Sequence, residues 1–149
     1  MPPYRRILVP VDGSEPSNGA LTTALQLARD SGGRVCLLHD IDELQYLIPY
    51  ADPGALIRAV RDEGRQVLQA ALATCASAGV PADSRLVEGV GRRLGEAVAD
   101  QAVSWNADLV VIGTHGRRGL KRVLLGSGAE QILRLSPVPT LLVRERPHA

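Results

Sequence analysis

The chain has 149 residues, of which 45% are hydrophobic and 22% are charged, and its net charge is +1. This length suits a single domain over residues 1–149 with its own hydrophobic core. The small net charge excludes a global attraction to nucleic acid or to anionic lipid. An aromatic content of 3%, without Phe, argues against a surface that stacks the bases of single-stranded nucleic acid.

The two cysteines, Cys36 and Cys75, have no spacing typical of a metal site or a redox pair. We therefore expect reduced, buried thiols, as in a cytoplasmic protein. The N-terminus has no signal-peptide layout, and no apolar run approaches the roughly 20 residues of a membrane helix. We expect a cytoplasmic protein with no membrane segment.

Hydrophobic periodicity and turn residues divide the chain into alternating strands and helices. In chain order the expected elements are a strand over Arg5–Val11, a helix from Ser14 to Ser31, a strand over Val35–Leu38, a loop over Leu44–Gly54, a helix over Ala55–Ser77, a strand over Ser84–Glu88, a helix from Arg92 to Trp105, a strand over Leu109–Ile112, a helix that begins near Gly126-Ser127, and a strand over Thr140–Val143.

Five strands that alternate with four helices predict an α/β, doubly wound, Rossmann-like parallel sheet. Unbroken apolar runs such as Leu109–Ile112 are typical of strands covered on both faces. A reversal of strand order leaves a crevice where the loops after the first and fourth strands face each other. Asp12 and the stretch Gly113–Ser127 are therefore expected to be neighbours, while periodicity alone does not fix the strand order.

The loop after the fourth strand is rich in glycine and in cations. Its glycines and cations are Gly113, Gly116, Gly119, Gly126, Arg117, Arg118, Lys121 and Arg122. Glycines let the backbone approach a ligand closely, and the helix start at Ser127 offers unpaired N–H groups and the positive end of the helix dipole. These features together predict a phosphate site. The simpler alternative is a solvated basic turn that only reverses the chain.

The spacing of the loop residues resembles a known signature. Gly113-x-x-Gly116, nine intervening residues and then Gly126-Ser127 are similar to the nucleotide-binding signature of the universal stress protein family. Residues 7–15, 37–42 and 107–113 resemble that family's opening strand and acidic turn, its second strand end and the approach to its signature. The resemblance covers nearly the whole chain, and it implies a five-stranded parallel sheet of order 3-2-1-4-5.

The resemblance also implies an ATP site. In ATP-binding members, the end of the first strand lies by the nucleoside, the end of the second strand touches adenine through its backbone, and the signature holds the phosphates and ribose. The positions assigned to that site here are Pro10, Val11, Asp12, Asp40, Gly113, His115, Gly116, Arg117, Gly126, Ser127 and Gly128. Mg²⁺ is expected with the nucleotide, through the phosphates.

Two of these positions depart from the family pattern. Asp40 replaces a small apolar residue and adds a carboxylate to the pocket. Gly128 stands where Val is common, and it is expected to loosen the first helical turn, since Gly costs roughly 1 kcal/mol relative to Ala in a helix. Both departures weaken the expectation of tight ATP binding.

Family members commonly dimerise through their last strand. Here residues 139–143 are apolar on both faces and are predicted to lie at the sheet edge, where an uncovered strand is a liability. The resemblance therefore implies a homodimer through Val138 to Arg144.

Several candidate residues have simpler interpretations. Asp12 is equally typical of an Asx turn, and His115 is expected to be a loop histidine without a catalytic role. Trp105 lies in phase with the core face of its helix and is interpreted as a core residue. The set His39, Asp40, Asp42 and Glu43 is not expected to bind metal, because neighbouring side chains of a strand point to opposite faces.

No catalytic constellation emerges from the sequence. The stretch Gly89–Gly95 has its last glycine one position too late for a dinucleotide fingerprint, and Gly119-Leu120-Lys121 lacks the spacing and hydroxyl of a Walker A motif. The expected function is therefore that of an ATP-binding regulatory protein of a stress response, with at most slow ATP hydrolysis. One alternative is an interaction module that binds no nucleotide and works through dimerisation and partner docking. An adenylate-forming or thiolation enzyme of the wider superfamily is disfavoured, because its phosphate loop is missing.

Overall fold

The computed structural model describes residues 4–42, 53–89, 91–114 and 125–144. Along this part of the chain the elements are β1 (Arg6–Pro10), α1 (Glu15–Ser31), β2 (Arg34–Asp42), α3 (Pro53–Ser77), β3 (Ala82–Gly89), α4 (Leu94–Ser104), β4 (Leu109–Gly113), α5 (Ser127–Leu135) and β5 (Thr140–Val143). Within these described residues strands and helices alternate, as the sequence predicts.

The five strands form one sheet of order β3-β2-β1-β4-β5, and every recorded pair is parallel. This confirms both the fold class and the strand order that the resemblance implies. β1 lies at the centre, where Ile7 pairs with Val35 of β2 and with Leu109 of β4. The order reverses at β1, so the C-terminal ends of β1 and β4 lie side by side at one edge of the sheet.

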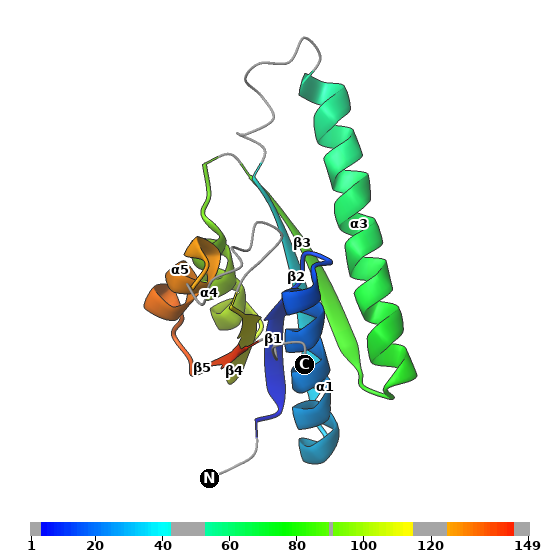
Figure 1. The fold of residues 1–149 in the computed structure, drawn as a ribbon, viewed down its shortest axis with the longest axis vertical. Helices are drawn as coiled ribbons and strands as arrows, with labels where there is room; N and C mark the ends of the chain where they lie inside the picture. Colours follow the sequence, from blue (N-terminus) through cyan, green and yellow to red (C-terminus); the bar gives the residue numbers. More distant parts are fainter. Residues whose placement is uncertain (1–3, 43–52, 90, 115–124, 145–149) are drawn as a thin grey trace, which may run out of the picture.

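Helices cover both faces of the sheet (Figure 1). On one face α1 and α3 pack over a buried cluster that includes Ile7, Val9 and Leu68. On the other face α4 and α5 pack over a second cluster that includes Leu8 and Ile132. Neighbouring residues of β1 serve opposite clusters because side chains alternate along a strand, and this is why the strand reads as a continuous apolar run.

Two strands and one helix extend further than the sequence predicts. β2 runs to Asp42 and pairs with β3 from Val35↔Ala82 to Asp42↔Gly89, whereas apolar patterning ends the expected strands earlier. The pairing uses main-chain groups, so it continues through polar side chains that the pattern treats as a strand exit. α3 begins at Pro53 rather than Ala55, consistent with the preference of Pro for the first helical position.

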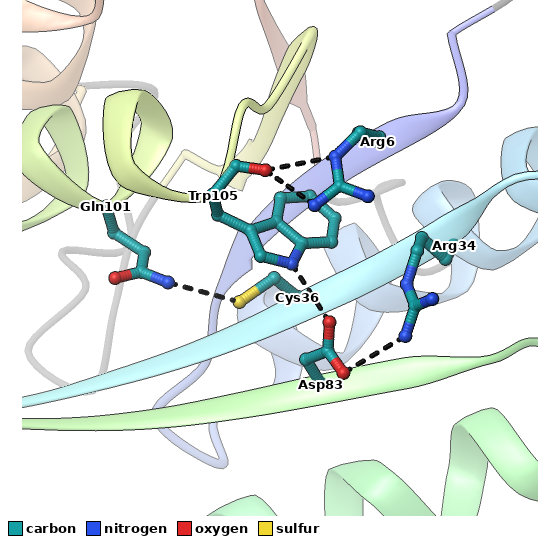
Figure 2. A network of polar contacts seen from close by, with 6 residues as sticks. All are labelled: Arg6, Arg34, Cys36, Asp83, Gln101 and Trp105. Carbon is teal, nitrogen blue, oxygen red and sulfur yellow. Dashed lines mark hydrogen bonds and ion pairs between the residues drawn. The ribbon is translucent and has the colours of Figure 1, made fainter.

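A polar network lies at the opposite end of the sheet, where the strands begin (Figure 2). The Trp105 indole Nε1 donates to Asp83 Oδ2 at 2.9 Å, and the Arg6 guanidinium lies 4.1 Å from the ring centroid. Arg6 also donates from Nε and Nη2 to the Trp105 carbonyl oxygen, at 3.0 and 2.6 Å. Trp105 is the C-cap residue of α4, and it is half-buried and packs against the cluster that includes Leu8 and Ile132, so it lies at the border of the core.

Both cysteines are free and buried. Gln101 Nε2 donates to Cys36 Sγ at 3.7 Å, and burial raises the pKa of the Cys36 thiol to about 11. Burial also raises the pKa of Cys75. Within the described ranges, no helix is long and apolar enough to cross a membrane.

Candidate functional site

The chain leaves β1 through a turn that Asp12 organises. Asp12 Oδ1 accepts from the Ser14 N–H at 2.9 Å and from the Ser14 hydroxyl at 2.5 Å, which is the Asx turn that the sequence offers as an alternative. The Asp12 N–H donates to Ser17 Oγ at 3.1 Å, and the Ser17 N–H donates to Ser14 Oγ at 3.3 Å. These bonds fix the turn to the first turn of α1, where Ser14 is the N-cap.

The end of β4 packs directly against this turn. A Cβ placed on Gly113 would lie 2.6 Å from the Pro16 carbonyl oxygen and 3.0 Å from Pro16 Cβ. Any side chain at Gly113 would therefore collide with the first turn of α1. This contact also places the exit of β4 beside the Asp12 turn, although about a hundred residues separate them in the chain.

The start of α5 returns to the same place. The Gly126 N–H donates to the Thr114 carbonyl oxygen at 2.8 Å, so the two ends of the glycine loop meet at the end of β4. Gly126 is the N-cap of α5, with φ −62° and ψ 153°, and no side chain caps this end. Ser127 is the first helical residue and its side chain is exposed. The first N–H groups of α5 and the positive end of its dipole therefore lie at the expected phosphate position.

Two glycines bring α5 close to α4. A Cβ on Gly95 would lie 2.7 Å from Gln131 Cβ, and a Cβ on Gly128 would lie 3.0 Å from Leu94 Cδ2. The Gly95 N–H also donates to Gln131 Oε1 at 3.3 Å. The contact with α4 therefore favours glycine at position 128, although a glycine there is also expected to weaken the first turn of α5.

The structure gathers most of the expected positions at one edge of the sheet. Seven expected positions lie at the C-terminal ends of β1 and β4 or at the start of α5. They are Pro10, Val11, Asp12, Gly113, Gly126, Ser127 and Gly128. Asp40 lies near the end of the neighbouring β2, on the α4–α5 face with Leu38. His115, Gly116 and Arg117 lie outside the described residues, as do the cations of the loop and most of the expected loop Leu44–Gly54.

Sequence reasoning missed the contact that His39 makes. His39 Nδ1 lies 2.7 Å from the Val11 carbonyl oxygen, beside the expected site. The only sequence signal is a histidine at the end of an apolar strand. In the described residues, no group of three or more His, Cys, Asp or Glu side chains is arranged to hold a metal ion.

A groove of about 560 Å³ lies between α1 and α3. Of the positions expected in the site, its lining includes Val11, beside helix residues such as Leu21, Val67 and Thr74. Among the described residues, its lining includes none from the start of α5.

The fold and the site together define a class: a doubly wound α/β protein with a glycine-bearing βα loop at the point where the strand order reverses. The sequence model of the universal stress protein family matches residues 3–144. Universal stress protein MJ0531 of Methanocaldococcus jannaschii is 30% identical over 144 residues, which cover 95% of this chain and 83% of that protein. The chain belongs to the universal stress protein family.

Solved structures agree with this assignment. The structure of hypothetical protein MJ0577 has a TM-score of 0.86 at 26% identity, and the match covers 98% of this chain and 99% of that one. A universal stress protein in complex with cAMP has a TM-score of 0.66 at 26% identity, with 95% and 97% covered. This chain shares its fold with both.

Proposed function

We propose that this chain binds ATP at the C-terminal edge of its sheet, with Mg²⁺ carried on the phosphates, and that it acts as a nucleotide-dependent regulatory module in the cytoplasm. The observation that carries the proposal is the hydrogen bond from the Gly126 N–H to the Thr114 carbonyl oxygen. It holds the uncapped start of α5 beside the end of β4 and the Asp12 turn.

The chemistry of this edge suits a phosphorylated ligand. The first N–H groups of α5 have no intrahelical partner and no side-chain cap, and such groups, at the positive end of the helix dipole, favour an anion as ligand. The cAMP complex of a relative at 26% identity supports an adenine nucleotide as the ligand class. The contacts assigned to His115, Gly116 and Arg117 rest on the resemblance to the family signature.

We ascribe no dedicated catalysis to the site. Phosphoryl transfer needs a metal, a positioned nucleophile and stabilisation of the transferring charge. The assigned residues supply the last of these, so ATP hydrolysis is expected to be slow and incidental.

The test uses a pair of variants at Gly126. Its φ and ψ are open to any residue, and both Asp and Asn are good N-caps, so Gly126→Asp and Gly126→Asn are expected to keep α5 folded to a similar degree. The two variants differ in one negative charge at the phosphate position. A carboxylate about 5 Å from a phosphate costs about 2 kcal/mol after screening, which is roughly a 30-fold loss of affinity.

The measurement is calorimetric titration of ATP with Mg²⁺ into the parent and both variants, with circular dichroism as the check on folding. Binding by the parent, retained by Gly126→Asn and weakened roughly 30-fold further by Gly126→Asp, supports the site. Absence of binding by the parent would refute the nucleotide proposal. The alternative function, an interaction module without nucleotide, would then be favoured.

We also propose that the protein is a homodimer through the β5 edge, Val138 to Arg144. β5 is the last strand in the sheet order, and its Leu141 side chain is 38% exposed. Pairing with a second copy would cover this edge and its apolar side chain. Leu135, the last residue of the preceding α5, is also exposed, at 44%.

A further inference from the structure

His39 connects three elements around the end of β1. It lies on β2, on the α1–α3 face of the sheet with Leu37. Its Nδ1 atom is 2.7 Å from the Val11 carbonyl oxygen, and the Val11 N–H donates to the Leu38 carbonyl oxygen at 2.8 Å. Both main-chain polar groups of Val11 are therefore held by β2.

The Val11 contact defines which nitrogen of the imidazole carries a hydrogen. A carbonyl oxygen only accepts hydrogen bonds, so His39 Nδ1 must carry the hydrogen and donate it. In the neutral ring the other nitrogen, Nε2, is then an acceptor. The bond lies just beyond the last recorded β1–β2 pair, Pro10↔Leu38.

α3 supports the imidazole from its other side. A Cβ placed on Gly64 of α3 would lie 2.8 Å from His39 Cδ2, 3.0 Å from Leu86 Cδ1 and 3.2 Å from Ile41 Cδ1. Glycine inside a helix costs roughly 1 kcal/mol relative to Ala, so the close approach to His39 is the compensating reason for Gly64. The ring therefore has little room to move away from Val11.

We propose that His39 is a positioning residue for the nucleotide site, an inference that rests on the function proposed above. Its Nδ1–H fixes the Val11 carbonyl, and the next residue, Asp12, carries the turn that shapes the β1 side of the site. Because Gly64 lets α3 pack against the same ring, His39 also couples the position of α3 to this part of the site.

Three substitutions separate the hydrogen bond from simple packing. His39→Asn places an amide nitrogen at the position of Nδ1 and keeps the donor. His39→Gln carries the same amide one carbon further out, and His39→Leu keeps an apolar side chain without a donor. If volume alone mattered, Gln and Leu would replace His better than Asn, because both are larger than Asn.

The first measurement is ATP affinity by calorimetry for the parent and the three variants. We expect His39→Asn to stay within about threefold of the parent, and His39→Gln and His39→Leu to lose about tenfold, the effect of one hydrogen bond. The second measurement is the ¹⁵N spectrum of the parent imidazole, which should show a protonated Nδ1 and an unprotonated Nε2 in the neutral ring.

The outcomes are distinguishable. If the parent binds ATP and Asn is no better than Gln and Leu, or if Nε2 carries the hydrogen, the positioning proposal is overturned while the nucleotide site stands. If the parent binds no ATP, the proposed function fails and the positioning proposal fails with it. Gly64→Ala provides an independent check, since it should weaken ATP binding in the parent and much less in His39→Leu, where the ring is already absent.

Discussion

The steric demand at Gly113 can be tested without any ligand. The substitution is Gly113→Ala, and its Cβ would lie 2.6 Å from the Pro16 carbonyl oxygen, 2.9 Å from the Pro16 carbonyl carbon and 3.0 Å from Pro16 Cβ. Two of these atoms are backbone and the third belongs to a proline ring, so none can rotate away. Overpacking against such atoms is expected to cost about 3 kcal/mol of the free energy of unfolding.

Gly19→Ala is the matched control. Gly19 also lacks a side chain, lies within α1 and has nothing within 4 Å of a built Cβ. Ala is the better helix former there, so this variant should gain about 0.5–1 kcal/mol. The same substitution, glycine to alanine, is thus expected to lower the free energy of unfolding at position 113 and to raise it at position 19.

The assay is urea unfolding followed by circular dichroism, with thermal unfolding beside it, both in the absence of nucleotide. For a chain of this size a loss of about 3 kcal/mol lowers Tm by roughly 6–12 °C. A Gly113→Ala variant that unfolds within about 0.5 kcal/mol of the parent would show that the chain accommodates the side chain and that the steric reasoning is wrong.

Three further changes test other parts of the structure. Trp105→Phe removes the indole donor to Asp83 and should lower the free energy of unfolding by about 1 kcal/mol in urea titrations; an unchanged midpoint would show that the bond contributes nothing. The pKa of Cys36 is raised from 9.0 to about 11 in the folded state, so the thiol ionises first in the unfolded state and the free energy of unfolding should fall as pH rises from 9 to 11. Cys36→Ala should show a smaller fall, and parallel pH profiles of the variant and the parent would contradict the raised pKa of Cys36. Leu141→Asp at the β5 edge should convert a dimer into a monomer in sedimentation, whereas a parent that already sediments as a 15.9 kDa monomer at micromolar concentration would refute the dimer.

Much of the sheet could be predicted from the sequence because strands such as β1 and β4 are short apolar runs, and turn residues separate them from the helices. Ser14 and Gly32 show why the helix ends were readable: Ser14 caps the start of α1, and Gly32 adopts the left-handed conformation, φ 69°, that ends it. The strand order came from the family resemblance, because periodicity is the same whichever strands are neighbours.

Contacts between distant residues could not be predicted in the same way. His39 and Val11 are 28 residues apart, and their hydrogen bond depends on the alignment of β1 with β2. The glycines inside α3 and α4, Gly64 and Gly95, signal that something approaches these helices closely. Which residue approaches is a property of the packed structure.

The glycines assigned to the candidate site do not all carry the same argument for nucleotide binding. Gly113 is required by the turn of α1, and Gly128 is favoured by the contact with Leu94, whether or not a nucleotide binds. Gly126 differs, because its backbone conformation is open to any residue and the N-cap of a helix is better served by Ser, Thr, Asp or Asn. A glycine at an uncapped helix start forgoes that stabilisation, and room for an anion at the first N–H groups is a reason to forgo it. The Gly126→Asp and Gly126→Asn pair therefore tests the proposed site where folding makes the least demand for glycine.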